Sequence, residues 1–206
     1  NGLNRFNRET HRFTRFAEES GIGNQIYKIT ALKNGQVFVG SNNGLGIWDP
    51  GTKTFTIHQP SDQENSLNSF LISDILEMND GEIMIATWER DLQVYHPADN
   101  SFHTITYLPE NRNVVNYRKR LVQDRDGTIW ISAQIHGLCR LDPITLKTKF
   151  FYQGPNGLNT DKLNGDMVVS PEGNIWLTTE QGGINIFDPK KETFEYITHQ
   201  EEEERS

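Results

Sequence analysis

Four copies of one sequence unit follow each other at a constant spacing of 46 residues, and this period restricts the folds open to the chain. Each copy has a turn pair of Asn, Asp or Glu followed by glycine, and the turn glycines are Gly35, Gly81, Gly127 and Gly173. Further along, each copy reaches a proline: Pro50, Pro97, Pro143 and Pro189. A short polar turn then leads to an aromatic residue: Phe55, Phe102, Phe150 and Phe194. Periods of about 20 to 50 residues are typical of solenoids and propellers.

Each unit reads as four short β-strands. The first strand is apolar and leads into the turn glycine, which can adopt a positive φ at little cost. The second strand is almost continuously apolar, as in IWIS at 129–132, and this pattern is typical of a strand covered on both faces. The third strand ends at the proline, which cannot donate to a ladder, and the fourth alternates like a half-exposed edge.

Four antiparallel strands per unit, repeated without helical periodicity, predict an all-β fold of the β-propeller type. A β-helix would need shorter coils, and a sandwich would not keep a 46-residue period. Residues 1–16 match only the second half of a unit. We therefore expect one propeller segment over 1–206, a partial arc with a leading half blade and four full blades, at 1–20, 21–66, 67–112, 113–158 and 159–204.

The best-formed unit resembles a known repeat. It contains Asp126-Gly127, Ile129-Trp130-Ile131, Gly137-Leu138 and Asp142-Pro143, and this pattern is similar to the two-component regulator propeller repeat. The first two units depart from the pattern. Phe38 and Met84 stand in place of the tryptophan, and Arg90-Asp91 stands in place of the glycine before Leu92.

The resemblance implies the extracytoplasmic, periplasmic sensor region of a hybrid two-component histidine kinase and response regulator. Such regions resemble detectors of poly- or oligosaccharides and usually form seven-bladed propellers, so this chain looks like an arc cut from a larger ring. It also implies that the kinase, the phosphorelay and any membrane anchor lie outside this chain, and that this segment is not itself an enzyme.

Composition excludes some partners. The formal net charge of −8 is unsuited to nucleic acid, which needs clustered Lys and Arg. The six histidines are scattered, and no HExxH or GxSxG motif is present, so we expect no cofactor, no metal site and no catalytic residues. Cys139 is the chain's single cysteine, and we expect it to be incidental, because the equivalent positions hold Gly46, Gln93 and Asn185.

Candidate ligand contacts lie on the face where the loop between the second and third strands varies among units. Trp88, Glu89 and Arg90 combine an indole with two charges, as saccharide sites do. Tyr117, Arg118, Gln134 and His136 are further candidates on this face. The alternative for Trp88 is simple packing over its own loop or a neighbouring blade.

Charges alternate along the first strands, seven residues before each turn glycine: Lys28, Asp74, Arg120 and Asp166. They could line a central channel, but we favour mutual compensation between adjacent blades. An open arc would also leave apolar blade faces uncovered, which suits a neighbouring blade or a second copy in a homodimer.

Two other functions stay open. The chain could be a protein-interaction scaffold, or a propeller lyase or hydrolase that acts on polysaccharide.

Overall fold

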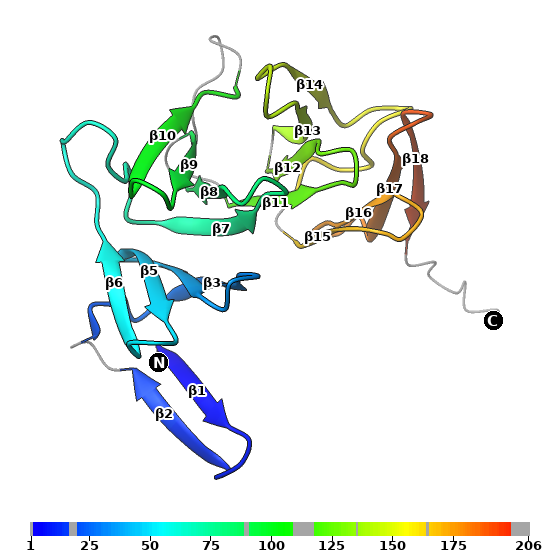
Figure 1. Ribbon diagram of the computed structural model, residues 1–206. Helices are drawn as coiled ribbons and strands as arrows, with labels where there is room; N and C mark the ends of the chain where they lie inside the picture. Colours follow the sequence, from blue (N-terminus) through cyan, green and yellow to red (C-terminus); the bar gives the residue numbers. More distant parts are fainter. Residues whose placement is uncertain are drawn as a thin grey trace. The chain divides into compact units, whose positions relative to one another are not determined.

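The structure is a computed structural model that describes residues 2–16, 20–88, 91–108, 118–134, 136–163 and 165–198. These residues form β-strands and turns and contain no α-helix (Figure 1). The chain divides into two compact units, Asn1–Lys119 and Arg120–Ser206. In the described part of the chain, no helix is long and apolar enough to cross a membrane.

The first unit contains one hairpin and two four-stranded antiparallel sheets. The hairpin pairs β1 (Leu3–Asn7) with β2 (Arg12–Phe16). The next sheet has the order β3 (Ile26–Ala31), β4 (Val37–Ser41), β5 (Gly44–Asp49) and β6 (Thr54–His58). The sheet after it has the order β7 (Ile72–Glu77), β8 (Ile83–Thr87), β9 (Leu92–His96) and β10 (Ser101–Ile105).

The second unit contains two further four-stranded antiparallel sheets. Their strands again follow chain order. One contains β11 (Lys119–Gln123), β12 (Ile129–Ala133), β13 (Gly137–Leu141) and β14 (Thr148–Phe151). The other contains β15 (Met167–Val169), β16 (Ile175–Thr178), β17 (Ile184–Asp188) and β18 (Thr193–Ile197). The expected unit of four sequential antiparallel strands, with a two-stranded leading half, is confirmed.

Burial follows the expected roles of the strands. Every residue of β8 and β12 is buried, which agrees with second strands that are covered on both faces. The fourth strands are paired on one side only and are partly exposed, as expected for edges. Each unit has a core of buried residues: Phe38, Ile75 and Tyr95 belong to a cluster in the first, and Trp130 and Phe187 to a cluster in the second.

The turns agree with the sequence prediction, but one of the four aromatic residues that follow the prolines does not. The four turn glycines all have positive φ, between 87° and 95°. Phe55, Phe102 and Phe194 lie opposite the aromatic residue near the end of the third strand, but the corresponding position in the third full sheet is Thr148, opposite Leu141. Phe150 is therefore not equivalent to the other three, because it lies seven residues after Pro143, whereas each of the others lies five residues after its proline.

The charges of the first strands form ion pairs within each unit. Lys28 Nζ lies 2.6 Å from Asp74 Oδ1 in the first unit. Arg120 Nε lies 3.7 Å from Asp166 Oδ1 in the second. Each pair joins neighbouring sheets, so compensation is confirmed for these four residues.

Candidate functional site

An aromatic and cationic cluster lies in the first unit and contains Tyr27, Trp88 and Arg118. Tyr27 belongs to β3, Trp88 directly follows β8, and Arg118 directly precedes β11. The ring centroids of Tyr27 and Trp88 are 5.1 Å apart, and their planes are tilted by 43°. The guanidinium carbon of Arg118 lies 5.4 Å from each centroid. At this range the ring quadrupole attracts a guanidinium, so the three side chains hold one another in place.

Irregular pairing at the start of the first strands positions this cluster. The register between β3 and β4 shifts between Ile26 and Lys28, which leaves Tyr27 inside the shift. The register between β7 and β8 shifts in the same way around Ser73. Bulges of this kind change the direction of a side chain and are common beside functional sites. Tyr27 therefore owes its place to a local backbone irregularity that recurs in the next sheet.

Lys119 fixes the backbone that carries Trp88. Its Nζ donates hydrogen bonds to the carbonyl oxygens of Thr87, at 2.5 Å, and Trp88, at 3.4 Å. Its backbone N–H donates to Ser73 Oγ at 3.4 Å. Burial lowers the pKa of Lys119 from 10.5 to about 8, and the Asp91 carboxylate offsets a part of that shift. A buried ammonium is thus placed against the turn that leads out of β8.

Several enclosed polar atoms around the cluster lack hydrogen-bond partners in the part of the chain that the structure describes. They are Trp88 Nε1, Arg118 Nε and Asp91 Oδ1, while Asp91 Oδ2 accepts from the Thr106 hydroxyl at 3.1 Å. An enclosed donor or acceptor without a partner costs about 1–3 kcal/mol. Hydroxyl groups of a ligand that reached these atoms would recover a part of that cost.

The structure brings together two of the seven candidates from the sequence, Trp88 and Arg118. Glu89, Arg90 and Tyr117 lie outside the described residues. Gln134 and His136 belong to the second unit, where Gln134 is partly buried and His136 is buried. Because Trp88 packs on Tyr27, the packing alternative for Trp88 also describes the structure.

Three residues of the cluster and its surroundings were missed: Tyr27, Asp91 and Lys119. Asp91 stands in register with three glycines, so its departure from the repeat was a usable signal. Lys119 stands in register with Tyr27, Ser73 and Gly165, and the side chains at those three positions are uncharged. Nothing in the sequence shows that these positions face Trp88.

Replacing Lys119 with methionine should change how stability depends on pH. Between pH 8 and 10.5 the unfolded chain holds more protons than the folded chain, because the folded-state pKa is lowered to about 8. The free energy of unfolding of the wild type therefore rises with pH in this interval, and below it the burial cost is fully present. Relative to Lys119→Met, the wild type should gain on the order of 1–3 kcal/mol between about pH 7 and about pH 10 in urea denaturation.

The matched control is Lys149→Met, which removes a half-exposed lysine paired with Glu192 in the second unit. It should show no comparable gain over the same pH interval. If the two substitutions changed the pH dependence of stability equally, the predicted gain would not come from the burial of Lys119.

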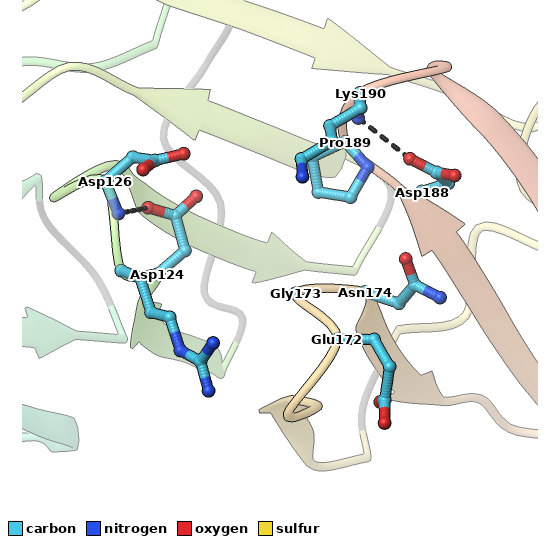
Figure 2. Close-up of a pocket in the computed structure, with 9 residues that line it drawn as sticks. Asp124, Asp126, Glu172, Gly173, Asn174, Asp188, Pro189 and Lys190 are labelled. Atoms are coloured by element: carbon cyan, nitrogen blue, oxygen red, sulfur yellow. Dashed lines mark hydrogen bonds between the residues drawn. The ribbon is translucent and has the colours of Figure 1, made fainter.

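A pocket lies in the second unit, between the turns that precede β12, β16 and β18 (Figure 2). Its acidic side chains mainly hold turns. Asp124 accepts from the backbone N–H of Asp126 at 3.0 Å and from the indole of Trp130 at 2.8 Å. Asp188 accepts from the backbone N–H of Lys190 at 2.9 Å. Carboxylates engaged in this way serve the fold, and we assign no binding role to this pocket.

Chemically reactive groups are not assembled in the described residues. They contain no group of three or more His, Cys, Asp or Glu that could hold a metal ion. Cys139 is buried in β13, and burial raises its pKa to about 12. A thiol in that state is a poor nucleophile.

The repeated four-stranded antiparallel sheets define the class of fold as a partial β-propeller, and solved structures agree. Two structures of the extracellular domain of BT4673 from Bacteroides thetaiotaomicron, described as a one-component and as a hybrid two-component system, match with a TM-score of 0.74 and 23% identity. The match covers 90% of this chain and 24% of that domain.

Two other solved structures support the same fold. The extracellular domain of BT3049 from the same organism, described as a hybrid two-component system, has a TM-score of 0.73 at 23% identity, over 98% of this chain and 26% of that one. Virginiamycin B lyase from Staphylococcus aureus has a TM-score of 0.67 at 13% identity, over 85% of this chain and 56% of that one.

The chain spans about a quarter of the length of the two-component domains that it matches. These domains are the kind of protein that the resemblance of the repeats implied. At these identities the matches establish the fold. No protein-family model and no curated protein matches the chain.

Proposed function

We propose that this chain is a ligand-sensing propeller segment from the extracytoplasmic part of a hybrid two-component sensor. Its expected ligand is an oligosaccharide, and a kinase outside this chain would receive the signal. The likeness to the extracellular domains of BT4673 and BT3049 supports this proposal, because those proteins are described as such systems. In this function the segment binds its ligand without transforming it.

The observation that carries the site assignment is the Tyr27–Trp88–Arg118 cluster. Aromatic rings can contact the apolar face of a sugar, and a guanidinium can donate to several hydroxyl groups. The unpartnered donors on Trp88 and Arg118 and the acceptor on Asp91 supply hydrogen-bonding capacity in the same place. A ligand would have to prefer one arrangement of the sensor over another in order to shift its state.

Calorimetric titration with a panel of defined oligosaccharides tests this function. For a saccharide that binds the wild type, Trp88→Ala should weaken binding about tenfold or more, because stacking and a buried hydrogen bond are lost together. The matched control is Trp176→Ala, which removes a partly buried indole from β16 in the second unit and should leave the affinity unchanged.

The possible outcomes distinguish a wrong function from a wrong site. If no saccharide in the panel binds the wild type, saccharide sensing by this chain is contradicted. If a saccharide binds equally well to the wild type and to Trp88→Ala, the site is elsewhere. Turnover of a bound saccharide would instead favour the lyase or hydrolase alternative.

A further inference from the structure

His58, at the end of β6, departs from the repeat. It pairs with Leu45 of β5. The residues that pair at the equivalent position of the other three full sheets are apolar: Ile105, Phe151 and Ile197. The first full sheet thus holds an imidazole where the others hold an apolar side chain, and packing of the strand does not require this exchange.

The surroundings of His58 keep its ring neutral and leave it short of a hydrogen bond. The ring centroid lies 5.2 Å from that of Phe102 and 5.6 Å from that of Tyr95. Burial lowers the pKa of His58 from its usual 6.5. The Nε2 atom is enclosed and has no hydrogen-bond partner within the described part of the chain. Because an enclosed polar atom without a partner costs free energy, the fold itself gives no reason for a histidine here.

A polar pocket lies beside His58 in the first unit. It has a volume of about 410 Å³. This value falls in the range of about 300–1,000 Å³ that is typical of small-molecule sites. The lining comes from the end of β6, from the loop at 61–67 and from the start of β10. His58 and Phe102 contribute rings to it, and Gln63 and Asn65 of the loop contribute amide groups.

The loop at 61–67 is held in place by hydrogen bonds to the neighbouring sheet. The carbonyl oxygen of Asn65 accepts from the backbone N–H of Phe102 at 2.8 Å. Gln93 of β9 is buried; its amide donates to the carbonyl oxygen of Ser66 at 3.0 Å and accepts from the backbone N–H of Asn68 at 3.0 Å. The wall of the pocket is therefore formed before any ligand arrives, which spares the ligand the entropy cost of ordering it.

The chemistry of the lining favours an uncharged ligand that is rich in hydroxyl groups. Among the described lining residues, Glu64 carries the one formal charge, so an anion would meet no cation there. The amides of Gln63 and Asn65 can both donate and accept hydrogen bonds. A hydroxyl group also does both, so it can pair with Nε2 of a neutral imidazole in either tautomer. The ring of Phe102 offers a surface for the apolar face of a sugar.

We propose that this pocket binds an uncharged monosaccharide, one of whose hydroxyl groups becomes the partner of His58 Nε2. Other hydroxyl groups pair with the amides of Gln63 and Asn65. The pocket shares no residue with the Tyr27–Trp88–Arg118 cluster. Binding here therefore does not depend on the sensing function proposed for that cluster.

The test is a titration of the wild-type chain with D-glucose, D-galactose, D-mannose and N-acetyl-D-glucosamine, followed by NMR. At least one sugar should saturably shift the imidazole resonances of His58, together with the amide signals of Gln63 and Asn65. D-Glucuronate carries a carboxylate in place of a hydroxymethyl group. It should bind at least about tenfold more weakly than the best neutral sugar, because the lining holds Glu64 and no cation in its described part.

Two variants test the contacts, with the affinity read from the remaining loop signals. His58→Phe should weaken binding about tenfold through the lost hydrogen bond, and the fold should accept it because Phe151 occupies the equivalent position. Asn65→Gly should weaken binding severalfold without straining the backbone, since Asn65 has a φ of 60°. The matched control is His96→Phe, the same exchange on β9 outside the pocket, which should leave the affinity unchanged.

Four results would overturn the proposal. None of the four sugars might shift the His58 resonances, D-glucuronate might bind as tightly as the best neutral sugar, or His58→Phe might bind as tightly as the wild type. In the fourth, a sugar shifts the indole signal of Trp88 and not the ring of His58, which would mean that the monosaccharide occupies the cluster instead. None of these results contradicts oligosaccharide binding at the Tyr27–Trp88–Arg118 cluster, so the two proposals fail separately.

Discussion

Trp130→Ala should destabilise the second unit by about 3–5 kcal/mol, among the largest losses expected for a single substitution in this chain. Trp130 is 1% exposed in the centre of β12. Its ring packs edge to face on Phe187 of the next sheet at 5.4 Å, and its Nε1 donates to Asp124 Oδ2 at 2.8 Å. Removing the indole therefore leaves a cavity between two sheets and an unpaired carboxylate oxygen, and urea denaturation measures the loss.

Trp176→Ala provides the comparison, because Trp176 occupies the same position of the repeat in β16 and is only partly buried. It should cost roughly 1–2 kcal/mol, since less apolar surface is lost. Asp124→Asn tests separately how much the hydrogen bonds of Asp124 contribute to stability. Asp124 uses one oxygen for two backbone N–H groups and the other for the indole, so an amide must give up one set, at about 1 kcal/mol. Equal losses for Trp130→Ala and Trp176→Ala would contradict the packing argument.

The fold could be predicted from the sequence because four copies of the unit resolve the secondary structure that one copy leaves ambiguous. One short apolar run such as IWIS cannot be assigned with certainty, but four runs in the same phase, each after a turn glycine and before a proline, leave few alternatives. The exception, Phe150, shows the limit of this reasoning. The turn after Pro143 has the same length as the others, and the position that holds phenylalanine in the other units holds Thr148, which pairs with Leu141.

The candidate site was less predictable, because it is assembled from positions that the repeat does not distinguish. Trp88 was identified as a departure from the pattern, and Arg118 through its place on the variable face. Tyr27 lies 61 residues before Trp88, and its contact depends on a bulge between Ile26 and Lys28 that has no clear sequence signature. Lys119 reads as an ordinary surface lysine, and its burial follows only from the hydrogen bonds to Thr87 and Trp88.

Gly137→Ala should also destabilise the second unit strongly, by about 3 kcal/mol or more. Gly137 begins β13 with φ +76°, and a Cβ built there would lie 2.2 Å from the backbone oxygen of Phe151. That oxygen belongs to β14, which pairs with β13 through Leu138 and Phe151. An alanine would therefore add a collision with the backbone to the ordinary cost of a positive φ, and the two strands would have to separate.

Gly127→Ala isolates the collision, because Gly127 also has a positive φ, +87°, in the same sheet. Its nearest neighbour would be the flexible side-chain nitrogen of Gln123, at 3.9 Å, so alanine there meets only the backbone cost of roughly 1–2 kcal/mol. The difference between the two variants in denaturation midpoint then measures the steric term alone. If both alanines cost the same, the close approach of β14 does not determine the glycine, and the repeat would tolerate other residues before Leu138 as it tolerates Asp91 before Leu92.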